Sequence, residues 1–82
     1  MSPVQSAVTA VLTEKFEVNP ESIRPEATLE SLDLDSLALA ELALVLQEQL
    51  GVRVEEDATA KRSTVSELVA ALNAERARRG VS

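Results

Sequence analysis

The sequence predicts an all-α fold, a small helical bundle of three main helices plus one short helix, with a long loop between the first two main helices. The chain is 45% hydrophobic, and its apolar residues are almost all Ala, Leu and Val, with one Phe, one Ile and neither Tyr nor Trp. This composition suits closely packed helices better than a sheet, where β-branched and aromatic residues accumulate. Apolar residues also recur at helical spacing in three segments that begin with capping residues.

The first helix is expected from Pro3 to about Glu17. Ser2 can cap this helix, Pro3 suits its first position, and Gln5 completes an S-x-x-Q capping box. Its apolar residues recur at helical spacing and are Val4, Ala7, Val8, Val11, Leu12 and Phe16.

A linker of 17 residues, "VNPESIRPEATLESLDL", follows the first helix. Pro20 and Pro25 break a regular helix, and Asn19 can cap at most a short turn. Because so long a linker is uncommon in a small domain, we expect its apolar residues to pack onto the core. These residues are Val18, Ile23, Leu29 and Leu32.

The central helix is expected from Ser36 to about Leu50, with Asp35 as its cap and Gly51 as a left-handed stop. Its apolar stripe is wide enough to contact several neighbours. The stripe consists of Leu37, Ala40, Leu42, Ala43, Val45, Leu46 and Leu50. Within it, the residues assigned to the core are Leu42, Val45 and Leu46.

The rest of the chain is expected to hold an extended connection, a short helix and a last helix. "GVRVEE" alternates like a strand, but a single strand has nothing to pair with. A short helical turn is expected from about Glu56 to Lys61. Thr64 and Glu67 form a second capping box, which begins a helix expected to end near Ala74.

Composition excludes several classes of function. The chain has neither Cys nor His, so it offers no thiol nucleophile and no imidazole proton shuttle. We therefore expect no enzymatic activity and no metal site. We also expect a cytoplasmic protein, because no apolar run is long enough to cross a membrane and the first residues lack a basic leader. One domain, 1–82, is predicted, with 1–2 and about 76–82 frayed.

The net charge of −6 is unevenly distributed along the chain. Residues 26–57 carry nine acids and one base, whereas the remainder sums to +2. Because phosphate backbones attract basic surfaces, nucleic acid is not an expected partner. A protein with a basic patch is favoured instead.

The stretch "LDLDSLALAEL", residues 32–42, contains the candidate functional residue, Ser36. In one interpretation Asp35 is an ordinary helix cap, Ser36 a tolerated first-turn residue and Leu37 a core contact. In the other, the Ser36 hydroxyl points outward at a helix N-terminus, where an attached phosphate meets no electrostatic obstacle. These residues alone leave both interpretations open.

Almost the whole chain resembles the acyl carrier protein family. The resemblance rests on the order and spacing of "VNPESIRPEATL", "LDLDSLALAEL", "LQEQLGVRV" and "RSTVSELVAAL". It implies that Ser36, flanked by Asp35 and Leu37, is esterified to 4′-phosphopantetheine from coenzyme A. The thiol of that group carries acyl chains as thioesters, so the resemblance implies a carrier and not an enzyme.

The resemblance also implies partners with basic patches, namely a phosphopantetheinyl transferase and acyl-processing enzymes such as an acyltransferase or a ketosynthase. We expect a monomer that binds neither nucleic acid nor a membrane. Glu55, Glu56 and Asp57 extend the acidic patch, and for these three an ordinary solvated charge remains an alternative to partner contact. The predicted partner-binding residues are Asp35, Leu37, Ala40, Glu41, Glu48, Glu55 and Glu56.

Three positions depart from the usual family pattern. Asp33 stands where glycine is usual, Glu55 where proline often follows the V-x-V exit, and Arg62 where an apolar residue usually closes the short helix. "DSLALAEL" is similar to discrete carriers of polyketide, antibiotic or other specialised-metabolite synthesis. A fatty-acid carrier, a peptidyl carrier and an unmodified helical adaptor remain alternatives.

Overall fold

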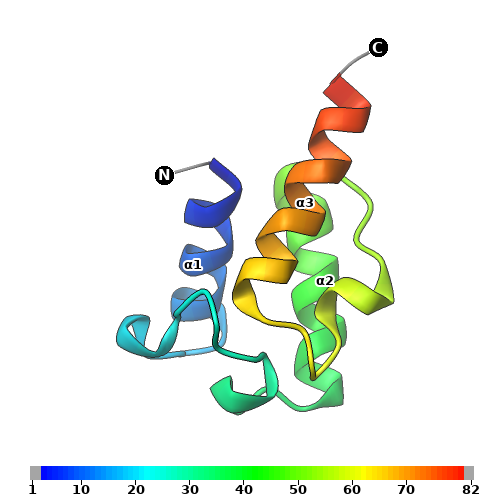
Figure 1. The fold of residues 1–82 in the computed structure, drawn as a ribbon. Coiled ribbons are helices and arrows are strands. Elements are labelled where there is room, and N and C mark those ends of the chain that lie inside the picture. The colour runs from blue at the N-terminus through cyan, green and yellow to red at the C-terminus, as the bar shows by residue number, and fades with distance from the viewer. Residues whose placement is uncertain (1–2, 81–82) are drawn as a thin grey trace.

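The computed structural model describes residues 3–80, and within them the chain forms α-helices, short 3-10 turns and no named strand. The all-α prediction is therefore confirmed for this part of the chain. Figure 1 shows that α1 runs opposite to α2 and α3, so that the N-termini of α2 and α3 lie at the same end of the molecule. The elements are α1 (Pro3–Lys15), η1 (Pro20–Ser22), η2 (Glu30–Leu32), α2 (Ser36–Leu50), η3 (Glu56–Thr59) and α3 (Val65–Gly80).

Helix α2 begins and ends where the sequence predicts. Asp35 Oδ1 accepts a hydrogen bond of 2.8 Å from the backbone N–H of Ala38, which satisfies one of the free donors in the first helical turn. At the other end Gly51 adopts a left-handed conformation with a φ of 65°, and its N–H donates to the Gln47 carbonyl. Local capping chemistry thus sets both ends of the central helix.

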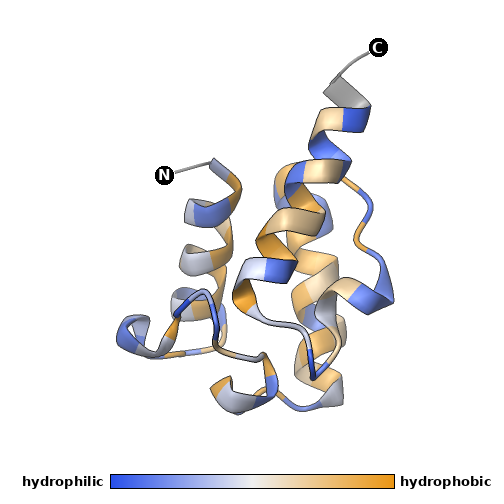
Figure 2. Cartoon of the chain, viewed as in Figure 1, coloured by the Kyte–Doolittle hydropathy of each residue, from blue (hydrophilic) through white to orange (hydrophobic). Residues whose placement is uncertain are grey.

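The core lies between the three helices, and hydrophobic residues line the side of α1 that faces the other two (Figure 2). In α2, Leu42 and Leu46 are fully buried as predicted, whereas Val45 is only half-buried. Leu39, which was not assigned to the apolar stripe, is also buried. The interpretation of Leu37 as a core contact is wrong, because its side chain is 69% exposed. The largest fully buried side chains are Leu12, Leu29, Leu42, Leu46, Leu68, Leu72, Val4 and Val8.

The long loop between α1 and α2 packs onto the core, as predicted. Asn19 caps a short turn by accepting a hydrogen bond from the Glu21 N–H. Backbone hydrogen bonds then join the loop to the segment that precedes and begins α3. These bonds run from Leu29 N to Ser63 O, Glu30 N to Lys61 O, Val65 N to Ala27 O and Ser66 N to Pro25 O. Of the apolar residues of the loop, Val18, Leu29 and Leu32 are buried, and Ile23 is half-buried.

The connection after α2 is extended and forms no strand, as predicted. Val52 and Val54 are both buried, and the Val54 N–H donates to the Gln47 side chain. The short helix is present but ends at Thr59, two residues earlier than Lys61. It contacts both α2 and α3.

The two outer helices differ from their predicted lengths. Helix α1 ends at Lys15, and Glu17 adopts a left-handed conformation with a φ of 55°. The predicted Ser2 cap lies outside the described residues. At α3 the capping box is confirmed, because the Thr64 and Glu67 side chains each accept a hydrogen bond from the backbone N–H of the other.

Helix α3 continues to Gly80, so the prediction that it ends near Ala74 is wrong, and residues 76–80 are helical rather than frayed. The tail lacks apolar anchors, but Ala and Arg have high helix propensity, and basic side chains near a helix C-terminus interact favourably with its dipole. Arg78 also pairs with Glu75 at 3.0 Å, one turn earlier. Among the helices within residues 3–80, none is long and apolar enough to span a bilayer.

Candidate functional site

Ser36 is the first residue of α2, and its side chain is exposed. Within the described residues no hydrogen bond engages its hydroxyl, and the capping contact to the first turn of the helix is made by Asp35. The first-turn N–H groups of Ser36 and Leu37 have no partner within the helix. The Ser36 hydroxyl is thus exposed at a position where the helix dipole favours an attached anion.

The segment that leads to Ser36 alternates between buried and exposed residues. Leu32 and Leu34 are buried, whereas Asp33 and Asp35 are exposed. Asp33 has a φ of 63°, in the left-handed region that favours glycine. The two leucines thus hold the segment on the core, and the left-handed residue between them turns the chain into α2.

A surface hollow of about 380 Å³ lies directly beside Ser36. It is bounded by the first turns of α2 and by η3 with the residues that follow it. Ser36 itself is part of its wall, so a group attached to the hydroxyl has an adjoining surface to lie against. The other residues that line it are Leu39, Ala40, Glu56, Thr59, Ala60 and Lys61.

An exposed stripe runs along α2 away from Ser36. It consists of Leu37, Glu41, Leu44 and Glu48, which alternate apolar and acidic side chains. At about 100° of rotation per residue, these four positions fall on one face of the helix. Leu44 is 59% exposed and was missed by the sequence analysis, although its spacing of seven from Leu37 was a usable signal.

All seven residues predicted to bind partners are exposed in the structure, namely Asp35, Leu37, Ala40, Glu41, Glu48, Glu55 and Glu56. The structure brings Asp35, Leu37 and Ala40 together at the start of α2, and Glu56 lines the hollow there. Glu55 differs from the others, because its carboxylate pairs with Arg53 at 3.3 Å. This pair is exposed and offsets part of the Glu55 charge.

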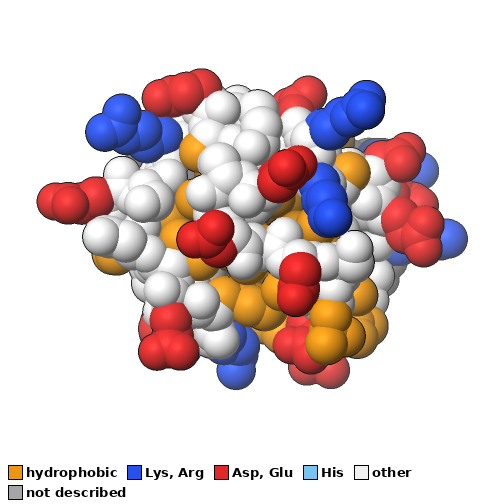
Figure 3. Space-filling model, turned by 90° about the horizontal axis from the view of Figure 1, so that it is seen from below, with side chains coloured by type: hydrophobic (Ala, Val, Ile, Leu, Met, Phe, Trp, Pro, Cys, Tyr) orange, Lys and Arg blue, Asp and Glu red, His pale blue; other side chains and the backbone are white. Residues whose placement is uncertain are grey.

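Figure 3 shows the end of the molecule where α2 and α3 begin. Acidic and basic side chains are both spread over this face, and hydrophobic side chains are exposed between them. This face therefore combines charged groups of both signs with exposed apolar surface.

The profile of the family described as "Phosphopantetheine attachment site" matches residues 6–72. This range includes all of α2, most of α1 and the first half of α3. An "Acyl carrier protein" of Thermosynechococcus vestitus is 33% identical, over 88% of this chain and 90% of the relative. "Acyl carrier protein 2" of Ralstonia nicotianae is 34% identical, over 79% and 82%. An "Acyl carrier protein" of Nitratidesulfovibrio vulgaris is 29% identical, over 82% and 90%.

Proposed function

Because this chain belongs to the acyl carrier protein family, whose members are carriers of covalent 4′-phosphopantetheine and not enzymes, we propose that Ser36 is its attachment residue. The observation that carries this proposal is the exposed Ser36 hydroxyl, which no hydrogen bond engages within the described residues. The group supplies a thiol for thioester formation, which a chain without cysteine lacks.

Incubation with coenzyme A and a phosphopantetheinyl transferase, followed by intact-mass measurement, tests this assignment. The protein should gain the mass of one phosphopantetheine group, and Ser36→Ala should gain none. Ser66→Ala is a matched control, because Ser66 is also an exposed serine in the first turn of a helix. A gain that survives Ser36→Ala refutes the assignment, and no gain in the wild-type protein favours an unmodified helical adaptor.

Acyl carrier proteins bind phosphopantetheinyl transferases and acyl-processing enzymes, and we propose that this chain does so through the α2 surface. The support is the exposure of all seven predicted residues and, for all of them except Glu55, a position beside Ser36 or along one face of α2. They are Asp35, Leu37, Ala40, Glu41, Glu48, Glu55 and Glu56.

We also propose that the carrier acts as a cytoplasmic monomer. If two copies paired through α2, Glu41 and Glu48 of one copy would face the same acidic residues of the other, and this repulsion would disfavour a dimer. Light scattering of the holo protein should therefore give the mass of one chain at all practical concentrations, and a concentration-dependent dimer would contradict this.

For the pathway we propose polyketide or other specialised-metabolite synthesis. The support is the run "DSLALAEL", in which an alanine follows the D-S-L motif. Mass spectrometry of the protein purified from its native host identifies the cargo directly. Acyl groups that retain keto or hydroxyl oxygens support the proposal. Saturated fatty acyl thioesters indicate a fatty-acid carrier, and aminoacyl thioesters indicate a peptidyl carrier.

A further inference from the structure

Lys61 is the one cation among the described residues that line the hollow beside Ser36. The only acid in that lining is Glu56. Within residues 3–80 the Lys61 ammonium makes no ion pair, although the preceding stretch 26–57 carries nine acids. Apart from Glu56, the other residues that line the hollow are neutral. The unpaired Lys61 ammonium is therefore available to an anion that enters the hollow.

The backbone around Lys61 is held in place from two sides. The Glu30 N–H of the long loop donates to the Lys61 carbonyl at 3.1 Å. The Ser63 N–H donates to the Ala60 carbonyl at 3.0 Å, and Thr59 is buried. Because the Lys61 backbone is held in the wall of the hollow, its flexible side chain can place the ammonium only within reach of that wall.

We propose that Lys61 pairs with the phosphate attached to Ser36 and so holds the first part of the phosphopantetheine arm against the hollow. This inference rests on the proposed attachment at Ser36 and assigns a positioning role to a residue outside the predicted site. A phosphate diester adds a negative charge to the most acidic part of the chain, and Lys61 is placed to compensate for that charge. Because the pair is exposed, its strength depends on ionic strength.

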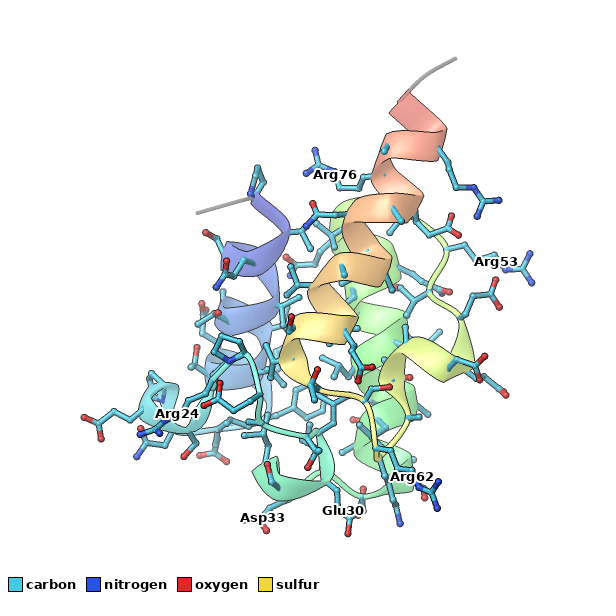
Figure 4. All side chains as sticks on the ribbon, in the orientation of Figure 1. Arg24, Glu30, Asp33, Arg53, Arg62 and Arg76 are labelled. Carbon is cyan, nitrogen blue, oxygen red and sulfur yellow. The ribbon has the colours of Figure 1, made fainter. Side chains whose placement is uncertain are left out.

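Arg62 provides a matched control for Lys61. It is the next residue in the sequence, carries the same charge, is exposed, and is not part of the hollow. Figure 4 shows Arg62 projecting at the same end of the molecule as Glu30 and Asp33. Removing either cation changes the net charge equally, so a difference between the two variants reports position and not charge alone.

Competitive acetylation measures the accessibility of the Lys61 amine, with Lys15 as an internal reference because these are the only two lysines in the chain. Lys15 lies at the end of α1 and does not line the hollow. The ratio of Lys61 to Lys15 acetylation, read by peptide mass spectrometry, should fall about two- to fivefold on conversion of the apo to the holo protein at low salt. At about 1 M salt, where the Debye length is about 3 Å, the difference should largely vanish.

An unchanged ratio overturns the proposal, and so does a decrease that persists at high salt, because the latter indicates steric shielding by the arm. Intact mass establishes beforehand that the holo protein has formed, so failure of the attachment at Ser36 is distinguished from failure of this pairing.

Phosphorus NMR of the holo variants gives a second readout that does not depend on lysine chemistry. Lys61→Ala should shift the phosphorus resonance and reduce its salt dependence, whereas Arg62→Ala should leave both unchanged. Equal responses from the two variants would show a general field effect and overturn the assignment to Lys61. Both side chains are exposed, so neither substitution threatens the fold.

Discussion

Asp35 combines a structural contact with a predicted recognition charge, and two substitutions separate these contributions. Asp35→Ala removes both the oxygen that accepts from the Ala38 N–H at 2.8 Å and the negative charge at the α2 N-terminus. Asp35→Asn removes the charge but retains an amide oxygen that can accept the same hydrogen bond. Comparing the two variants therefore distinguishes capping from electrostatics.

The expected effects on stability follow from this geometry. Loss of an N-cap costs about 1 kcal/mol, so Asp35→Ala should lower the free energy of unfolding by about that amount. For a domain of this size this corresponds to a decrease in Tm of about 4–8 °C. Asp35→Asn loses only the interaction of the carboxylate with the helix dipole, which is about 0.3–1 kcal/mol. Ser36→Ala should leave stability almost unchanged, because no hydrogen bond engages that hydroxyl within the described residues.

Urea unfolding measures these free energies, and the rate of phosphopantetheine attachment measures recognition. If the Asp35 charge contributes to recognition, both variants should be modified more slowly, and by a similar factor, despite their different stabilities. Equal destabilisation by Asn and Ala would show that the capping hydrogen bond does not stabilise α2. Wild-type attachment rates in Asp35→Asn would refute a role for the charge.

Three further predictions follow from burial, backbone conformation and surface charge. Asp33→Gly should raise the free energy of unfolding by up to about 1 kcal/mol in a urea titration, because φ is 63° there, while Asp33→Ala should not raise it. Leu46→Ala should lower the free energy of unfolding by about 2–5 kcal/mol, because Leu46 is fully buried. Leu37→Ala should lower it by less than about 0.5 kcal/mol, because Leu37 is 69% exposed, but should weaken partner binding. Glu41→Gln combined with Glu48→Gln should slow attachment at low salt and reduce its salt dependence in stopped-flow assays, and unchanged rates would exclude steering by these acids.

Local interactions explain why so much of α2 could be predicted from sequence. The Asp35 cap, the Gly51 stop and the exposed Ser36 all depend on groups within about four residues of one another. The same holds for the Thr64–Glu67 capping box. Each such hydrogen bond forms wherever its short motif begins or ends a helix, so the motif predicts it without knowledge of the rest of the fold.

Packing decided what local patterns could not. The apolar pattern placed Leu37 in the stripe and omitted Leu39, but in the folded protein Leu39 is buried and Leu37 is exposed. The length of α3 was also underestimated, because apolar periodicity stops before the helix does.

The helical class, the position of Ser36 at a helix start and the acidic character of its surroundings could all be predicted from the sequence, since they depend on composition and on neighbours along the chain. Only the tertiary structure placed Lys61 and Ser36 in the walls of one hollow. That arrangement results from the long loop bonding to the segment before α3 and from η3 packing against α2, which are contacts between residues distant in sequence. No periodicity or motif within a short segment encodes such a contact.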